Sequence, residues 1–287
     1  MNILLFNVHL YGYGGSELWT HTMYHQLKKD HNVSVYTKYP GIISAQLNTV
    51  TKPPKDIDVI IGAHWVHMKK EGLHKLAPII LVSHSFFLEV ERFERGAAKY
   101  VAISDEIARI RKKYNPTVIY NPIDFKVYRP IKPPRKRLTK VLYLSHGGRK
   151  ADNIIKEACE EYGVEYLQFD KRRIDLSGYI NEADMCIGIG RCAIEAMACG
   201  RSVIIGDWRN YQQEFSGSGL LMPDELDACR GHNYTGRHNP KALTKQDLIN
   251  YFEMYLADTS YVDAVKRHHD VEVVAEQFMG VYAQIPN

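Results

Sequence analysis

Short apolar runs alternate with amphipathic stretches along the first half of the chain. The runs are apolar almost throughout, which is typical of parallel strands covered on both faces. Residues 17–29 and 105–114 separate some of them and carry the apolar spacing of helices, with Ser104 as an expected N-cap. This alternation predicts βαβ units in a doubly wound sheet. The expected strands of this half are 2–8, 33–36, 59–61, 79–83, 100–103 and 118–120.

The pattern breaks at residues 129–137, which hold three prolines and five basic residues. Proline cannot continue a helix or donate to a central strand, so this segment is predicted to be a linker with solvated charges. A contact with nucleic acid or with a membrane surface is the alternative interpretation of those charges.

The alternation restarts after the linker and again predicts a Rossmann-like unit. A glycine, Gly200, closes one of its helices, as expected for a C-terminal position that needs a left-handed backbone. The expected strands are 140–145, 165–169, 185–189 and 202–206, and the expected helices are 151–161, 191–199 and a final stretch 263–282. We therefore expect an α/β chain with domains at 1–128 and 129–262, followed by a C-terminal helical segment at 263–287.

The composition is that of an ordinary globular protein, with 45% apolar and 24% charged residues. A net charge of +4 suits an anionic ligand but does not by itself indicate nucleic acid. The first residues lack the features of a signal peptide, and no apolar run approaches the roughly 20 residues that span a bilayer. The five cysteines form no C-x-x-C pair, which favours reduced, structural thiols in a cytoplasmic protein.

The first strand leads into a glycine-rich turn, in which Gly14 and Gly15 precede Ser16 and Glu17. Glycine lets the backbone approach a ligand closely, and the N–H groups that begin the next helix can bind phosphate. The spacing is neither G-x-G-x-x-G nor a P-loop, which disfavours a nicotinamide-dependent enzyme. A turn without any ligand is the alternative.

A second glycine-rich turn precedes the helix expected at 191–199. Gly188 and Gly190 lead into Arg191, and Glu195 lies one turn into the helix. A carboxylate at this position can accept hydrogen bonds from the vicinal hydroxyls of a ribose, while the nearby N–H groups face a diphosphate. The apolar neighbours of Glu195 predict a partly buried carboxylate rather than a surface residue that only complements the helix dipole.

Taken in order, these motifs resemble the GT-B-fold glycosyltransferases of retaining family 4. Residues 14–17 resemble that family's Gly-Gly-x-Glu loop, and residues 101–104 with 118–124 resemble the stretch before its linker. Residues 175–184, followed by 195–200 and 203–204, resemble its nucleotide-sugar donor block. The resemblance implies two Rossmann-like, doubly wound parallel-sheet domains facing across a cleft, with the C-terminal helix crossing back to the first. It also implies transfer of a sugar from a nucleoside diphosphate to a hydroxyl, with retention at the anomeric carbon.

The resemblance further implies roles for individual residues. Arg149 and Lys150 would hold the diphosphate, with an exposed basic turn as the alternative. Glu214 resembles a further acidic position of the family. His84 resembles the histidine that faces the donor sugar, where it would bond a hydroxyl or transfer a proton, and His64 would be its neighbour. Histidines that only cap or pack are the alternative for both.

The family's first donor-site glutamate falls on Ile187 in this sequence, which bears on the donor sugar and on activity. Two other functions therefore stay open: a catalytically silent nucleotide-sugar-binding protein, and a transferase that glycosylates modified nucleic-acid bases. In the second, the linker and residues 171–173 would contact phosphates.

The expected partners follow from this resemblance. The donor is a nucleotide sugar, and the acceptor hydroxyl stays open among a glycan, a lipid-linked molecule and a nucleic acid, with peripheral membrane contact as an option. No spacing of metal ligands is present, so we expect no metal and no cofactor besides the donor substrate.

Overall fold

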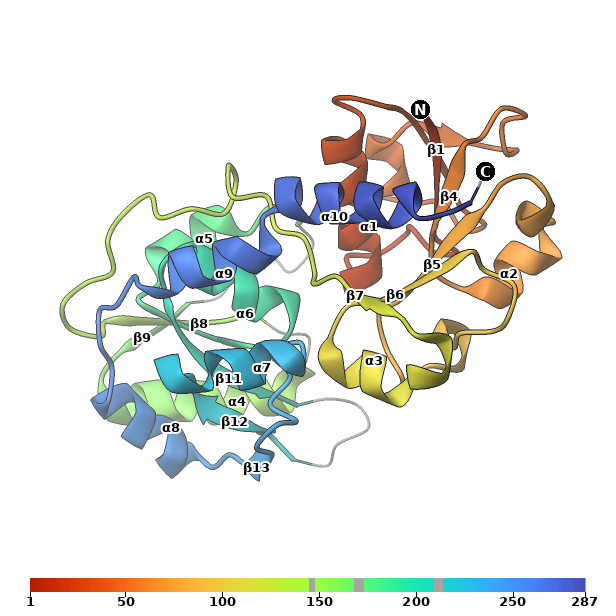
Figure 1. The fold of residues 1–287 in the computed structure, drawn as a ribbon. Helices are drawn as coiled ribbons and strands as arrows, with labels where there is room; N and C mark the ends of the chain where they lie inside the picture. The colour runs from red at the N-terminus through yellow and green to blue at the C-terminus, as the bar shows by residue number, and fades with distance from the viewer. Residues whose placement is uncertain (145–147, 168–172, 209–213, 287) are drawn as a thin grey trace. The chain divides into compact units, whose positions relative to one another are not determined.

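The computed structural model describes residues 1–144, 148–167, 173–208 and 214–286, without the side chains of residues 148 and 149. The chain divides into two compact units, Met1–Pro122 with His269–Asn287, and Ile123–His268 (Figure 1). Ile123 and Tyr128 already belong to the hydrophobic core of the second unit, which explains why this unit begins before the proline-rich segment. No described helix is long and apolar enough to cross a membrane.

The first unit contains a seven-stranded sheet in the order β3-β2-β1-β4-β5-β6-β7. All of its strand pairs are parallel. The central strands are buried on both faces, as their continuous apolar runs predict. The strands are β1 (Asn2–Phe6), β2 (Asn32–Tyr36), β3 (Thr49–Val50), β4 (Val59–Gly62), β5 (Ile79–Ser83), β6 (Lys99–Ala102) and β7 (Thr117–Val118).

The helices of this unit are α1 (Gly15–Leu27), α2 (Trp65–Lys70), α3 (Asp105–Ile110) and α10 (Val271–Ala283). Ser104 caps α3 by accepting a hydrogen bond from the Ile107 N–H, which confirms the expected N-cap. In α10, Phe278 packs against Trp19 of α1 with ring centroids 5.5 Å apart. The helix α10 therefore belongs to the core of the first unit.

The second unit contains a six-stranded sheet in the order β13-β12-β11-β10-β8-β9. The four strands from β9 to β11 are parallel, and β12 and β13 add an antiparallel edge. The sequence analysis missed this edge because Ser216–Leu220 is rich in serine and glycine, which have little preference for strands. The strands are β8 (Lys140–Tyr143), β9 (Glu165–Leu167), β10 (Met185–Gly188), β11 (Ser202–Asp207), β12 (Ser216–Leu220) and β13 (Lys241–Ala242).

The final helical stretch, expected as one helix at 263–282, is two helices. Asp270 leaves the helical conformation, with φ −58° and ψ 126°, and its side chain accepts a hydrogen bond from the Glu272 N–H. It therefore ends one helix and caps the next. The helices of the second unit are α4 (Gly148–Tyr162), α5 (Ser177–Glu182), α6 (Arg191–Ala198), α7 (Leu226–Gly231), α8 (Lys245–Glu253) and α9 (Tyr261–His269).

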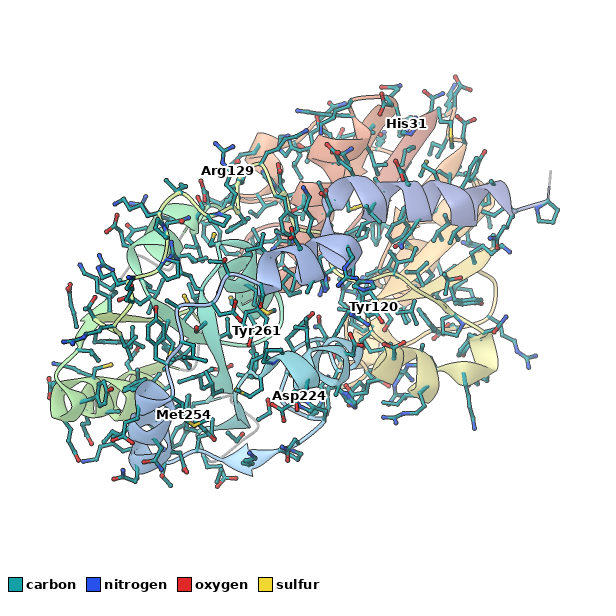
Figure 2. The ribbon with its side chains drawn as sticks, turned by 60° about the vertical axis from the view of Figure 1, so that its left-hand side comes forward. His31, Tyr120, Arg129, Asp224, Met254 and Tyr261 are labelled. Atoms are coloured by element: carbon teal, nitrogen blue, oxygen red, sulfur yellow. The ribbon has the colours of Figure 1, made fainter. Side chains whose placement is uncertain are left out.

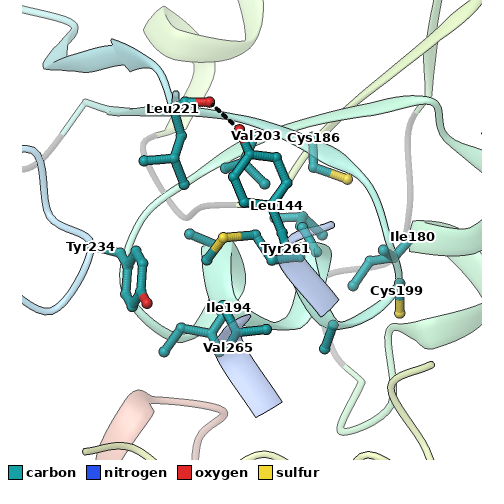
Figure 3. Close-up of a cluster of buried hydrophobic side chains, with 14 of the residues drawn as sticks. Leu144, Ile180, Cys186, Ile194, Cys199, Val203, Leu221, Tyr234, Tyr261 and Val265 are labelled. Carbon is teal, nitrogen blue, oxygen red and sulfur yellow. Dashed lines mark hydrogen bonds between the residues drawn. The ribbon is translucent and has the colours of Figure 1, made fainter. Parts of the chain in front are cut away.

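Both faces of the second sheet are covered by apolar clusters. Alternate residues of one strand point to opposite faces, so Cys186 and Ile187 of β10 enter different clusters. Figure 3 shows the cluster around α6, where Ile194 lies near Val265, and where the Tyr261 hydroxyl donates to the Leu221 carbonyl at 2.8 Å. The packing on both faces fixes the register of β10, which leads into the turn before α6.

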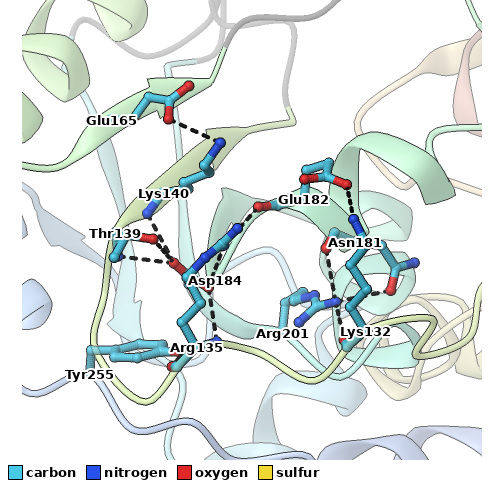
Figure 4. A network of polar contacts seen from close by, with 10 residues as sticks. All are labelled: Lys132, Arg135, Thr139, Lys140, Glu165, Asn181, Glu182, Asp184, Arg201 and Tyr255. Atoms are coloured by element: carbon cyan, nitrogen blue, oxygen red, sulfur yellow. Dashed lines mark hydrogen bonds and ion pairs between the residues drawn. The ribbon is translucent and has the colours of Figure 1, made fainter.

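All five basic residues of the linker are exposed, as expected, although two of them form ion pairs. Arg129, at its start, is exposed (Figure 2). Lys132 pairs with Glu182 at 2.5 Å, and Arg135 pairs with Asp184 at 3.0 Å (Figure 4). These ion pairs reduce the positive charge that the linker offers to a polyanion.

Asp184 is completely buried and accepts five hydrogen bonds. Its Oδ1 accepts from the backbone N–H and guanidinium of Arg135, and its Oδ2 accepts from the Thr139 N–H, the Thr139 hydroxyl and the Lys140 N–H (Figure 4). Burial pushes the pKa of Asp184 upward, but the bonds from Thr139 and Arg135 outweigh it and lower this pKa. The carboxylate thus ties the linker to the start of β8.

Replacing Asp184 by Asn should destabilise the chain by about 2–4 kcal/mol at pH 7, because a buried charged acceptor is lost. Since folding lowers this pKa, the wild-type advantage is present above the unfolded pKa and disappears as the pH falls below about 4. Urea unfolding at pH 7 and pH 3 measures both effects. Asp224→Asn, at an exposed site of the same unit, is the control. Equal losses at the two pH values would contradict the assignment.

Candidate functional site

Each sheet has a switch point, where the strand order reverses and ligands bind in doubly wound folds. It lies between β1 and β4 in the first unit and between β8 and β10 in the second. Because neighbouring strands are parallel, the loops that follow these strands meet at the carboxyl edge of each sheet. The sequence-predicted site residues described below lie in or near these loops.

The turn between β10 and α6 depends on a glycine. Gly190 has φ 57° and ψ −130°, a conformation that only glycine adopts without strain. Its N–H donates to the Tyr234 carbonyl at 2.9 Å. A side chain on Gly188 would lie 3.4 Å from the Cβ atoms of Cys192 and Leu144. The turn is therefore tight and brings the first N–H groups of α6 to the carboxyl edge of the sheet.

Glu195 is a buried carboxylate, as the sequence pattern predicts, with 2% of its surface exposed. Its Oε1 accepts a hydrogen bond from the Arg191 Nε at 2.7 Å. Burial raises the pKa of Glu195, whereas the Arg191 guanidinium opposes that rise. The start of α6 is therefore joined to its second turn by an ion pair, in which the Arg191 side chain is only 11% exposed.

The other residues expected at the donor site are less well defined by the geometry. Lys150 is exposed at the start of α4, and its Nζ lies 5.1 Å from the centre of the Trp208 ring, as in a cation–π contact. The side chain of Arg149 and residues 145–147 lie outside the described part of the chain. Glu214 is exposed just after residues 209–213, which also lie outside it.

Ile187 is an internal residue of β10, completely buried in an apolar cluster. Its backbone pairs with Tyr143 on one side and Ile204 on the other. Position 187 therefore belongs to the core of the sheet. A carboxylate could not stand here without an unpaired buried charge.

In the first unit, His64 is held at both ring nitrogens. It follows β4, is 5% exposed and has a left-handed backbone with φ 69°. Its Nδ1 lies 3.3 Å from the Val8 N–H, which can only donate, so in this geometry the ring proton sits on Nε2. Nε2 lies 3.2 Å from Oε1 of Glu91. His64 is thus engaged inside the protein.

The sequence analysis missed Glu91, a carboxylate with 4% of its surface exposed. Besides contacting His64, it accepts a hydrogen bond from the His84 N–H at 3.0 Å through Oε2. Burial would raise the pKa of Glu91, but the bond from His64 and the nearby His84 lower it overall. Glu91 therefore joins the two histidines that the sequence pattern placed after separate strands. The neighbouring glutamates, Glu89 and Glu94, are exposed, so the local sequence gives no sign that Glu91 is buried.

His84 follows β5, and its ring meets the Trp19 ring edge-on with centroids 5.3 Å apart. Burial lowers the pKa of His84, and Glu91 opposes this only in part. The imidazole is therefore neutral near pH 7 and has both a donor and an acceptor nitrogen.

His9 is a second residue that the sequence analysis missed. It follows β1 as His64 follows β4, so the same criterion could have found it. The two rings lie 6.3 Å apart, at the switch point of the first sheet. Burial lowers the pKa of His9, and the neighbouring His64 lowers it further.

The glycine turn before α1 holds a carboxylate close to the backbone. Glu17 accepts a hydrogen bond from the Ser16 hydroxyl at 2.9 Å. A side chain on Gly14 would lie 2.5 Å from the Glu17 carboxylate and would displace it, whereas a side chain on Gly15 would meet nothing within 4 Å. The two glycines therefore differ: Gly14 accommodates Glu17, and Gly15 begins the helix.

The five cysteines are free thiols. Burial raises the pKa of Cys159 and of Cys229 to about 12, so both stay protonated and unreactive at neutral pH. Among residues 1–144, 148–167, 173–208 and 214–286, no group of three or more His, Cys, Asp or Glu side chains could hold a metal ion.

Replacing Gly190 by Ala should destabilise the chain by about 1–3 kcal/mol, because a side chain is strained at this φ and ψ. Gly178→Ala is the matched control, since Gly178 lies in α5 and an added Cβ there meets nothing within 4 Å. It should leave stability unchanged or raise it by about 0.5–1 kcal/mol. Urea unfolding of the two variants measures the difference, and equal effects would refute the role of the turn.

No protein-family model matches the chain, and no curated protein matches it. Solved structures do match along nearly its whole length. HepE from Anabaena, in complex with UDP and glucose, has a TM-score of 0.65 at 14% identity, over 99% of both chains. A glycosyltransferase from Rickettsia africae has a TM-score of 0.59 at 12% identity, over 99% of this chain and 98% of that one.

A third similar structure is an α-glucosyltransferase in complex with UDP and a 13-mer DNA that contains an HMU base. It has a TM-score of 0.53 at 10% identity, over 99% of this chain and all of the other. At such identities the likeness establishes the architecture. The chain therefore has the GT-B fold of these glycosyltransferases, with a parallel-sheet unit in each half.

Proposed function

We propose that the chain is a glycosyltransferase that moves a sugar from a nucleoside diphosphate to an acceptor hydroxyl. The observation that carries the proposal is the carboxylate of Glu195, buried one turn into α6 behind the Gly190 turn. This turn lies at the switch point of the second sheet, where doubly wound folds bind nucleotides. The similar HepE structures contain UDP or UDP-glucose, which supports a nucleotide sugar as the donor here.

In the donor half of the reaction, Glu195 would accept hydrogen bonds from the ribose hydroxyls. The N–H groups at the start of α6 would face the diphosphate, because a helix N-terminus favours negative charge. Arg191, Arg149 and Lys150 would add positive charge as the diphosphate leaves. Because Arg191 already bonds Glu195, ribose binding requires this pair to loosen or share its hydrogen bonds.

In the acceptor half, His84 would hydrogen-bond the transferred sugar as a neutral imidazole. We assign His64 a positioning role, since both of its ring nitrogens have partners inside the protein. Glu91 would act with it, because this carboxylate also holds the backbone at His84. The Gly14–Gly15 turn would approach the donor phosphate.

Two finer features rest on the family resemblance. The first is retention at the anomeric carbon, which NMR of the product tests directly. The second is independence of metal ions, because basic side chains and N–H groups would stabilise the negative charge of the leaving diphosphate. Activity that survives EDTA would support the second feature, and activity that requires an added divalent cation would refute it.

One observation favours a second candidate function, a nucleotide-sugar-binding protein without turnover. Ile187 is buried inside β10, so the family's first donor-site carboxylate has no counterpart at this position. Nucleotide binding without release of diphosphate from any donor would select this candidate.

Transfer to modified nucleic-acid bases gains less support, since Lys132 and Arg135 of the linker are paired with carboxylates. Of residues 171–173, only Arg173 lies in the described part of the chain.

The proposal predicts that the chain releases nucleoside diphosphate from one class of UDP-, GDP- or ADP-sugar. Glu195→Gln should lower kcat/KM about 10- to 100-fold, because a charged acceptor of hydrogen bonds is lost. Glu253→Gln, at an exposed site on α8, is the control and should match the wild type. A coupled diphosphate assay measures the rates, and circular dichroism verifies that both variants fold. Equal rates in wild type and Glu195→Gln would contradict the assignment.

A further inference from the structure

Two exposed tyrosines surround His9 at the carboxyl edge of the first sheet. The Tyr39 ring stacks on the His9 ring with centroids 4.9 Å apart and planes 14° apart. The Tyr11 ring meets His9 edge-on at 5.4 Å. Tyr39 is 51% exposed and Tyr11 is 61% exposed. Because one face of Tyr39 covers His9 and half of the residue is still exposed, its other face is open to solvent.

Backbone hydrogen bonds hold this aromatic platform, formed by His9, Tyr11 and Tyr39, in place. The Leu10 N–H donates to the Tyr39 carbonyl at 2.9 Å, and the Tyr39 N–H donates to the Val8 carbonyl at 3.0 Å. A side chain on Gly41 would lie 2.4 Å from the Cα of Tyr11, so the two loops touch. A platform that is already ordered loses little entropy when it binds a partner.

The platform also borders the candidate site of the first unit. His9 lies at the switch point, with its ring 6.3 Å from that of His64. Tyr11 leads directly into the glycine turn that begins α1. A molecule lying on Tyr39 and Tyr11 would therefore have its neighbouring groups close to the histidines of this unit.

The chemistry of the platform suits a sugar ring. A pyranose has a face of C–H groups that packs on a flat aromatic ring, and a rim of hydroxyls that bond to polar edges such as phenol and imidazole. Nucleobases also stack on tyrosine, but a nucleic acid needs cationic groups for its phosphates. Lys38, the basic neighbour of Tyr39 in the sequence, is ion-paired with Glu71.

From these observations we infer that His9, Tyr11 and Tyr39 form a subsite for a sugar ring of a carbohydrate acceptor. The inference rests on the proposed glycosyl transfer and names its acceptor class. Tyr39 supplies the open flat face, Tyr11 supplies a second exposed ring, and His9 aligns both. The acceptor hydroxyl would then be presented toward His64 and His84.

Binding of the full-length chain to a glycan array, followed by calorimetry with the best glycan, tests the subsite. Tyr39→Leu should weaken glycan binding about tenfold, because it removes the flat aromatic face and keeps apolar bulk. Tyr39→Phe keeps that face and should bind within about twofold of the wild type. Phe87→Leu, which removes a 54% exposed aromatic ring elsewhere in the first unit, should leave binding unchanged.

Three outcomes would overturn the inference: no glycan binds, Tyr39→Leu binds as tightly as the wild type, or a single-stranded oligo-dT probe binds in place of glycans through Tyr39. The failure of this inference is distinguishable from that of the proposed function. Diphosphate release without Tyr39-dependent glycan binding removes only the subsite. Tyr39-dependent glycan binding without diphosphate release from any donor keeps the subsite and removes the transferase.

Discussion

The ion pair between Arg191 and Glu195 is the interaction on which the proposed donor site depends. A carboxylate that is 2% exposed is costly to bury unless a charge or several donors compensate for it. Arg191 lies one helical turn before Glu195 and meets it at 2.7 Å. The pair requires both residues to be helical, and α6 begins at Arg191, directly after the unusual backbone of Gly190. Glu195 is therefore both a structural residue of α6 and the proposed ribose-binding residue.

The parallel order of the strands determines where the remaining chemistry gathers. In the first unit, His9, His64 and His84 follow three different strands, yet all lie at the same edge of the sheet. Glu91 lies at the end of the loop that follows β5. It contacts the His64 ring and accepts a hydrogen bond from the His84 N–H, so it holds both ends of that loop together. Such a network is rigid because each buried polar atom of the carboxylate has a partner.

The sequence predicted the central strands and the two-unit architecture well, because continuous apolar runs leave few alternatives to a parallel sheet covered on both faces. It failed where tertiary contacts decide. The strand β12 contains serine and glycine, and Gly217 is needed there because a side chain would lie 1.9 Å from the Ile205 carbonyl. The boundary at Ile123 depends on a core that forms only after folding.

The same distinction applies to the site. The burial of Glu195 was predictable because a carboxylate among apolar neighbours near a helix start is unusual. Glu91 was not, since its burial depends on a histidine 27 residues away in the sequence. The alignment of Ile187 with a family glutamate and its place in an expected strand at 185–189 were both visible in the sequence, and the structure adds that its side chain is completely buried.

Isothermal titration calorimetry of the full-length chain with UDP, GDP and ADP tests the central claim most directly. The account predicts saturable binding of one of these diphosphates, and weaker binding of it by Glu195→Gln under conditions in which circular dichroism shows the variant to be folded. The absence of binding heat with all three diphosphates, or equal affinity in the variant, would contradict a nucleotide-sugar site at α6.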